Sequence, residues 1–350
     1  MTVTASRAQG PNPQSFGSMF WENQFKTTIP LPPQDGCLEG QVAIITGANS
    51  GMGFESAKQM LVAGLSRLVM GVRSTKRGQD AAAQLQHINP DATINVWEVD
   101  MEIYTSIHTF VRRCETELPR IDFAILNAGI APADHVVLET GHESTVQVNY
   151  LSTVLLGILL LPVLKAKRPP GTDRAPRLIT LGSITARNAK FPNRHQRPLL
   201  ASFDEVTAVA PWEPQRPLPR LQAAVPDDVR AHRGALRRRA RRGHYPVGAR
   251  LGRGTGLFRA LSAVPRFVVR VLLWVCGRPL ERGAATYFDA AVRQPGGSHG
   301  AYVMNCKVAP YADLMYTDEA EGIADALWDE TMAELGFASA IGVLESMKSQ

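Results

Sequence analysis

Short apolar runs that alternate with helical segments constrain the fold of this chain more than any other feature of its sequence. From residue 38 onward, five such runs follow one another, and the segments between them have helical periodicity. Strands that are apolar on both faces lie buried between layers of helices and pair in parallel. Because such connections are right-handed, the pattern predicts one α/β domain with a doubly wound, Rossmann-like parallel sheet of about six or seven strands.

The predicted elements fill the first half of the chain and return near its end. Strands are expected at residues 42–46, 68–72, 93–99, 121–126, 177–181 and 301–304. Helices are expected at residues 54–63, 74–87, 104–118, 143–164 and 279–293, the second of them capped by Ser74.

Composition divides the chain into a leader, a domain and a tail. Residues 1–37 are rich in Pro, Gln, Ser and Thr, and they are expected to form an extended leader with Trp21 and Phe25 as isolated anchors. Residues 38–310 are expected to form the domain that contains the sheet, and residues 311–350 a helical tail.

Basic charge is concentrated in one Arg- and Pro-rich segment, residues 190–253, which is expected to be irregular. The net charge is +6, yet residues 215–253 alone contain 11 Arg and no Lys against 2 acidic residues, a local charge of +9. One alternative function follows, in which these arginines contact the phosphates of a nucleic acid or an acidic membrane surface. Within residues 215–253 only Tyr245 is available for base stacking, so a solvated loop is favoured and no nucleic-acid partner is expected.

The cysteines and the apolar runs argue against other classes of protein. Four scattered cysteines without a CxxC pair are typical of reduced thiols in a cytoplasmic protein rather than of a disulfide scaffold. The first residues lack a basic region followed by an apolar stretch, so no secretory signal is expected. The longest apolar run, residues 154–164, is too short to span a bilayer, and no integral membrane segment is expected. The histidines show no metal-ligand spacing, and no metal is expected.

A glycine-rich octapeptide, Thr46-Gly47-Ala48-Asn49-Ser50-Gly51-Met52-Gly53, lies between the first predicted strand and its helix. Gly47 allows a tight turn, Gly51 lets the backbone approach a pyrophosphate, and Gly53 allows close packing of the helix. The N–H groups and partial positive charge at the start of the helix attract phosphate. A structural turn is the alternative, but the strand before the motif and the helix after it favour dinucleotide binding.

The spacing T-G-x-x-x-G-x-G resembles the short-chain dehydrogenase/reductase family, and other motifs of that family follow in order. The resemblance is strong over residues 38–187 and moderate over residues 254–307. It implies a nicotinamide-dependent oxidoreductase whose cofactor contacts are Gly47, Asn49, Ser50, Gly51, Met52 and Gly53. It further implies cofactor contacts at Asp100, at Asn127 of Asn127-Ala128-Gly129 and at Thr255, and catalytic roles for Asn149 and Ser183.

Basic residues after the second predicted strand distinguish between the two nicotinamide cofactors. An NAD-binding chain normally carries Asp or Glu at this strand end, and its carboxylate accepts hydrogen bonds from the ribose hydroxyls. Here no acid occurs before Asp80, whereas Arg73 can bind a 2′-phosphate bidentately and Lys76 adds a point charge. A solvated basic helix start is the alternative. The pattern favours NADP over NAD.

The resemblance also implies a catalytic Tyr with a Lys four residues later, and this pair is absent. In register the pair should fall near Leu218 and Gln222, and no Lys occurs between Lys190 and Lys307. A pseudoenzyme that kept its cofactor fold is one explanation. A local reading-frame error in the coding sequence is favoured, because residues 215–253 lose helical periodicity, lysines and the sixth strand together, and family-like sequence then resumes.

The expected function is an NADP-dependent oxidoreductase that reduces a carbonyl or oxidises an alcohol on a small apolar natural product. The leader and the phrase Phe203-Asp204-Glu205-Val206 resemble a filamentous-fungal branch of the family that acts in secondary-metabolite biosynthesis. Homo-oligomers are common in the family, so a weakened homo-oligomer is expected for this chain. Without its Tyr and Lys the chain is expected to be a very poor reductase.

Overall fold

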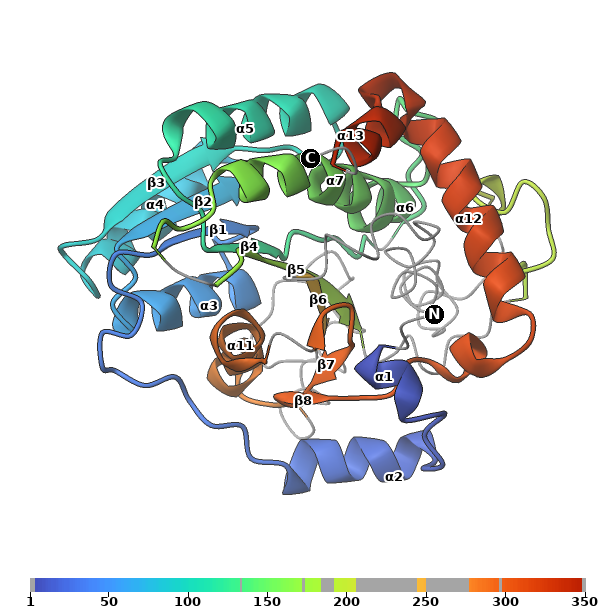
Figure 1. Ribbon diagram of the computed structural model, residues 1–350, viewed down its shortest axis with the longest axis horizontal. Coiled ribbons are helices and arrows are strands. Elements are labelled where there is room, and N and C mark those ends of the chain that lie inside the picture. Colours follow the sequence, from blue (N-terminus) through green and yellow to red (C-terminus); the bar gives the residue numbers. More distant parts are fainter. Residues whose placement is uncertain are drawn as a thin grey trace.

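The predicted parallel sheet is present and lies between two layers of helices (Figure 1). Its order is β3-β2-β1-β4-β5-β6-β7-β8, parallel from β3 to β7, with β8 added antiparallel to β7. The strands are β1 Val42–Thr46, β2 Arg67–Val72, β3 Thr93–Glu98, β4 Phe123–Leu126, β5 Arg177–Ser183, β6 His244–Ala249, β7 Val303–Met304 and β8 Lys307–Val308. The computed structural model describes residues 4–132, 134–171, 174–183, 192–205, 244–249, 277–295 and 298–347.

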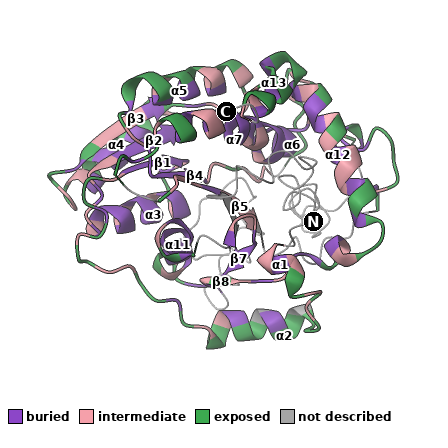
Figure 2. Ribbon diagram, viewed as in Figure 1, coloured by how far each residue is buried: buried purple, intermediate pink, exposed green. Residues whose placement is uncertain are grey.

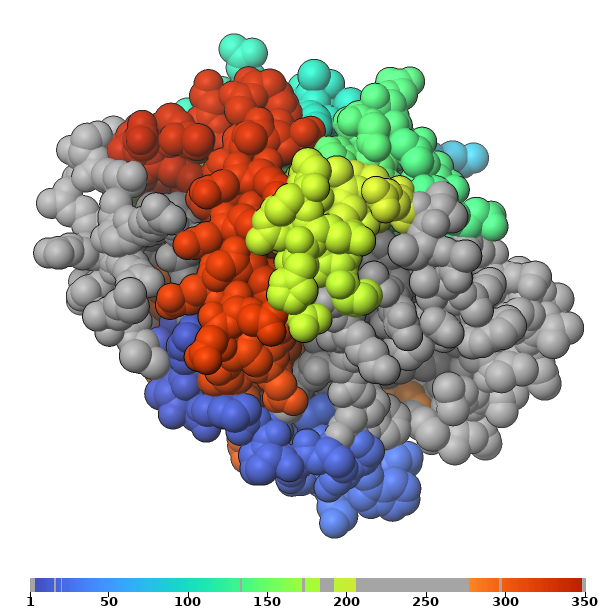
Figure 3. All heavy atoms as spheres, turned by 90° about the vertical axis from the view of Figure 1, so that its right-hand side faces the viewer, coloured from blue at the N-terminus to red at the C-terminus, as the bar shows by residue number. Residues whose placement is uncertain are grey.

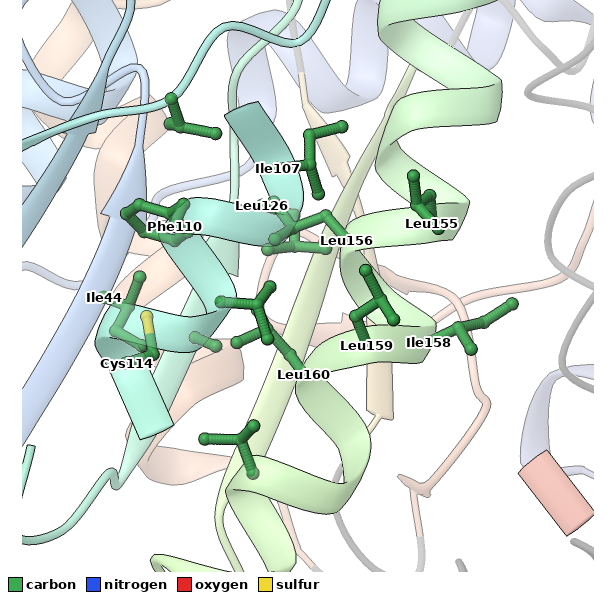
Figure 4. Close-up of a cluster of buried hydrophobic side chains, with 14 of the residues drawn as sticks. Ile44, Ile107, Phe110, Cys114, Leu126, Leu155, Leu156, Ile158, Leu159 and Leu160 are labelled. Carbon is green, nitrogen blue, oxygen red and sulfur yellow. The ribbon is translucent and has the colours of Figure 1, made fainter. Parts of the chain in front are cut away.

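Helices cover the sheet on both faces, as the apolar strands require. The first strand shows why: Val42 and Ile44 join one buried cluster, whereas Ala43 and Ile45 join another on the opposite face. The first cluster is closed by α5 (Tyr104–Glu117) and α7 (Ser152–Ala166), and Figure 4 shows how their side chains interdigitate. The second is closed by α3 (Gly51–Val62), α4 (Thr75–Gln86) and α11 (Leu280–Phe288), and α11 continues as a π-helical turn over Asp289–Arg293.

The most apolar helix among the described residues is a core element. It runs over Ser144–Ala166 as α6 (Ser144–Val146), a π-helical turn (Gln147–Leu151) and α7. With a mean hydropathy of 1.8 it is long and apolar enough to cross a membrane, yet 72% of its most apolar stretch is buried inside the protein. Figure 2 shows α7 as a buried element between α5 and the sheet. Burial against α5 and the sheet accounts for its apolar composition.

The sixth strand corrects the expectation that residues 190–253 are irregular throughout. β6 pairs in parallel with β5 over six residues, from Leu178↔His244 to Ser183↔Ala249, and on its other side with β7. The sequence concealed this strand because Pro246 and Gly248 are poor strand formers. The unpaired edge of β5 needs a partner, so the position is set by the sheet rather than by local propensity. A short 3₁₀ helix at Ala201–Phe203 is a second regular element within this range.

The leader is partly helical and packed, which corrects the expectation of a loosely attached extended segment. It contains α1 (Ala5–Ala8), α2 (Phe16–Trp21) and a π-helical turn (Glu22–Lys26). Trp21 and Phe25 are not its anchors, because they are 58% and 48% exposed and contact each other. The buried hydrophobic side chains of the leader, among those that the structure describes, are instead Met19 and Ile29.

Two arginines, one just before α11 and one on it, attach the leader to the domain. Arg278, which is only 4% exposed, donates to the carbonyl oxygens of Asn23 and Thr27 and to Oδ1 of Asn305 at 3.0 Å. Arg282 donates to the carbonyl of Ile29. These bonds satisfy the backbone of a segment that has no strand partner, so the leader is part of the folded unit.

We expect Arg278→Met to lower the free energy of unfolding by about 2–3 kcal/mol, since it leaves buried carbonyl and amide oxygens without donors. Urea unfolding followed by circular dichroism measures the change. Arg293→Met is the matched control, because Arg293 is exposed and donates to one leader carbonyl, that of Leu31, at 3.2 Å. Equal effects of the two substitutions would show that the Arg278 contacts do not hold the leader.

Candidate active site

The predicted site residues gather at one edge of the sheet. Parallel strands end at the same edge, and the order changes direction between β1 and β4, where doubly wound sheets bind ligands. Five strand ends converge there: Gly47 follows β1, Arg73 follows β2, Asp100 lies just after β3, Asn127 follows β4, and Ser183 ends β5.

The glycine loop forms a cradle that admits no side chain at its centre. Gly47 and Gly51 have φ of +66° and +58°, a region that favours glycine. A Cβ on Gly53 would lie 2.5 Å from both the carbonyl oxygen of Gly47 and Nδ2 of Asn127. Ser50 precedes α3 without a side-chain cap, so the first N–H groups of α3 are left for an external acceptor. The cradle therefore fits a pyrophosphate.

The remaining loop residues differ in what they offer to a cofactor. Ser50 is exposed and Asn49 is half-buried, so both are accessible beside the cradle. Met52 is buried, and its side chain packs against α11, where a Cβ on Gly283 would lie 2.7 Å from its Cε atom. Of Met52, only the backbone is therefore placed for cofactor binding.

Asn127 holds the glycine loop in shape. Its Nδ2 donates to the carbonyl oxygen of Thr46 at 2.8 Å, and its backbone N–H and that of Ala128 both donate to Thr46 Oγ1 at 2.9 Å. Its Oδ1 accepts a hydrogen bond from the hydroxyl of Tyr287 at 3.3 Å. Tyr287, on α11, is fully enclosed, and burial raises the pKa of its phenol. We assign Tyr287 as a positioning residue that the sequence analysis missed, since 160 residues separate it from Asn127.

Removing the Tyr287 hydroxyl should loosen this arrangement without a large change in volume. We expect Tyr287→Phe to weaken NADPH binding about 5- to 20-fold, because the Asn127 amide loses one of its orienting bonds. Fluorescence titration gives the dissociation constant. Tyr302→Phe is the control, since that phenol is also buried but lies in the cluster beside the leader. Unchanged affinity in Tyr287→Phe would show that the bonds to the Thr46 and Gly47 carbonyls suffice to orient the amide.

Polar residues at the ends of β2 and β3 form the outer rim of the site. Arg73 is exposed, and its Nη1 lies 2.6 Å from Oε1 of Glu102. Lys76 is exposed on the first turn of α4, where the Ser74 hydroxyl accepts a hydrogen bond from the Arg77 N–H. Asp100 accepts a hydrogen bond from the Glu102 N–H at 3.0 Å, which fixes the turn between β3 and α5.

The structure places Asn149 by its hydrogen bonds and Ser183 by its backbone alone. Asn149 lies in the π-helical turn before α7, where its amide donates to the carbonyl of Ile130 and accepts from the Ile130 N–H, both at 2.8 Å. This pairing makes Asn149 hold the loop after β4. The backbone of Ser183 ends β5 beside the switch point. Thr255 and the register positions 218 and 222 lie outside the described residues.

A cluster that the sequence did not indicate joins residues 192–205 to the tail helix α12 (Ala320–Glu334). His142 Nδ1 lies 2.7 Å from Oδ2 of Asp204, and its Nε2 lies 3.3 Å from Oε1 of Glu334. The hydrogen bond to Asp204 raises the pKa of His142. Glu330 accepts hydrogen bonds from the N–H groups of Leu199 and Leu200 at 2.8 and 2.5 Å. Figure 3 shows the two segments side by side at the surface.

Fold and site together define a Rossmann-like protein with a glycine cradle that fits a pyrophosphate, and comparison with known proteins identifies its family. Residues 41–192 match the family described as short chain dehydrogenase. The chain is 42% identical over 340 residues to short chain dehydrogenase/reductase mfmJ of Annulohypoxylon moriforme, with 95% of each chain covered. It is 39% identical over 336 residues to short chain dehydrogenase virL of Hypocrea virens, with 94% of each covered. The chain belongs to the short-chain dehydrogenase/reductase family, whose members bind a nicotinamide cofactor.

Solved structures share the fold at low sequence identity. A Shigella flexneri short chain dehydrogenase complexed with NADP aligns with a TM-score of 0.55 at 16% identity, covering 79% of this chain and 100% of that chain. An NADPH-bound short chain oxidoreductase from Pseudomonas aeruginosa aligns with a TM-score of 0.55 at 18% identity, covering 78% and 96%. These likenesses support the doubly wound architecture.

Proposed function

We propose that this chain is an NADP(H)-dependent oxidoreductase that interconverts a carbonyl and an alcohol on a small apolar natural product. The observation that carries the cofactor assignment is the rim of the site. Arg73 and Lys76 stand beside the end of β2, and the first acid after that strand is Asp80, on α4. Two cations after β2 suit a 2′-phosphate, whereas a chain that binds NAD normally carries Asp or Glu at the end of this strand.

We assign some residues of the site to the cofactor and others to the substrate. The first turn of α3 and the glycine loop would hold the pyrophosphate, and Arg73 with Lys76 would hold the 2′-phosphate. Bound NADPH supplies the hydride. We assign Ser183 the hydrogen bond to the substrate carbonyl oxygen, which stabilises the negative charge that develops there. A proton must then reach that oxygen, and in this family a Tyr acidified by a Lys delivers it.

The sequence lacks this Tyr and the Lys four residues after it, and we propose a local reading-frame shift as the cause. The alignment to the Annulohypoxylon relative covers 95% of both chains, so the two proteins are closely similar in length. This supports a local shift of reading frame across residues 215–253 more than a deletion of the catalytic segment. A pseudoenzyme that binds NADP(H) without turnover is the second candidate, and sequencing the transcript distinguishes the two.

The substrate class rests on resemblance alone. The fungal relatives support a small apolar natural product as the substrate, and we propose that the reaction takes place in the cytoplasm. Comparing the metabolites of a deletion strain with those of its parent tests the class. Loss of one apolar natural product is expected, and a defect in primary metabolism would contradict the proposal.

Titration of the protein with both cofactors tests the cofactor assignment directly. We expect NADPH to bind at least about tenfold more tightly than NADH, because the 2′-phosphate gains charge-assisted hydrogen bonds to Arg73 and Lys76. Nicotinamide fluorescence gives both dissociation constants. Equal or tighter binding of NADH would overturn the NADP assignment, and absence of binding by both would overturn cofactor use by this chain.

A further inference from the structure

The cationic rim of the site carries an acid of its own. Glu102 lies between β3 and α5, and its Oε1 is 2.6 Å from Nη1 of Arg73. Its side chain is 31% exposed and that of Arg73 is 52% exposed, so the pair lies at the solvent boundary. Because Arg73 is the residue to which the 2′-phosphate is assigned, Glu102 occupies part of the receptor that the phosphate would use.

The backbone holds Glu102 in this place. The Val99 N–H donates to the Val72 carbonyl at 3.0 Å, which fixes the adjacent ends of β2 and β3. The Asp100 carboxylate then accepts from the Glu102 N–H, and the Ser106 hydroxyl accepts from the Asp100 N–H at 2.9 Å. The turn therefore presents the carboxylate of Glu102 to Arg73 before any cofactor arrives.

We propose that Glu102 is a specificity-determining residue that competes with the cofactor's 2′-phosphate for Arg73 and so limits the preference for NADP over NAD. This inference rests on the proposed NADP(H) function. A phosphate bound at Arg73 carries close to two negative charges and would stand within a few ångströms of the Glu102 carboxylate. The phosphate must displace that carboxylate or share the guanidinium with it, and either event disfavours the phosphorylated cofactor. NADH, with a neutral 2′-hydroxyl, meets no such repulsion.

The repulsion is moderate because solvent screens it. The Glu102 carboxylate and a 2′-phosphate a few ångströms away would interact weakly at physiological salt, because both lie near the surface. For a dianion we expect this repulsion to lower the affinity about three- to tenfold. Lys76 and Arg77, both exposed on the first turn of α4, take part in no ion pair among the residues that the structure describes. They leave the rim net positive, so Glu102 reduces the preference for phosphate without reversing it.

Calorimetric titration with adenosine 2′,5′-bisphosphate and with 5′-AMP isolates the 2′-phosphate, because the two nucleotides differ only in that group. Glu102→Gln should tighten binding of the 2′,5′-bisphosphate about three- to tenfold and change binding of 5′-AMP less than about twofold. Glu102→Ala must shift the ratio in the same direction. Asp91→Asn is the matched control, because it removes the same charge from an exposed residue at the opposite end of β3 and should leave the ratio unchanged.

Each outcome separates the inference from the function on which it rests. If wild-type protein prefers the 2′,5′-bisphosphate and Glu102→Gln leaves that preference unchanged or lowers it, the competition is refuted while the NADP assignment stands. A wild-type protein that prefers 5′-AMP overturns both. In an Arg73→Met background the gain from Glu102→Gln should shrink, and an undiminished gain would refute competition for Arg73.

Discussion

Protein with the present sequence will reduce carbonyl substrates at least about 10²–10⁴-fold more slowly than protein from a transcript in which a one-base correction restores Tyr-x-x-x-Lys near residues 218 and 222. General acid catalysis is worth about this factor, and loss of the Lys removes both the acidity of the phenol and a contact to the nicotinamide ribose. NADPH consumption with a panel of aromatic ketones measures the difference.

Two controls separate the possible causes of low activity. NADPH titration of both proteins shows whether the cofactor site is equally intact. A loss of activity in Ser183→Ala of the corrected protein would show that its turnover uses the assigned site. If the transcript confirms the present sequence and turnover is absent, the pseudoenzyme interpretation holds. If that same chain turns over as fast as the corrected one, the assigned mechanism is wrong.

Gly53→Ala should weaken NADPH binding by about 100-fold or more. The added Cβ would meet the Gly47 carbonyl oxygen and the Asn127 amide at 2.5 Å, and neither can retreat, because the first belongs to the backbone and the second is bonded to Thr46. The loop must therefore shift by a fraction of an ångström to an ångström, and displacements of this size at a preorganised site cost about two orders of magnitude. Fluorescence titration measures the loss.

Gly322→Ala provides the matched control for that substitution. Gly322 lies on α12, where an added Cβ would have nothing within 4 Å, and Ala is the better helix former by about 0.5–1 kcal/mol. We expect Gly322→Ala to bind NADPH normally and to unfold at slightly higher urea. Normal NADPH binding by Gly53→Ala would show that the loop tolerates displacement and that the cradle is not preorganised.

Most strands of the sheet could be predicted from local sequence because each is a short run of apolar residues. β1 was predicted at residues 42–46 and is observed at Val42–Thr46, and β2 and β3 differ from prediction by one residue at one end. The glycine motif could be assigned for a similar reason, since a strand, a positive φ and a helix start are consecutive in the chain. β6 was missed because its residues carry little strand propensity, and the edge of β5 places it.

The sequence by itself therefore determined the doubly wound fold, the cradle at the end of β1 and the basic rim after β2. Only the tertiary structure decided which distant side chains meet: Tyr287 on Asn127 and Glu102 on Arg73 at the site, and Asp204 and Glu334 on His142 in the cluster that joins residues 192–205 to α12. It also decided that Arg278 attaches a leader that composition had marked as loose. The physical reason is range: periodicity and propensity act over a few residues, whereas these polar pairs form between segments that meet only after the core has packed.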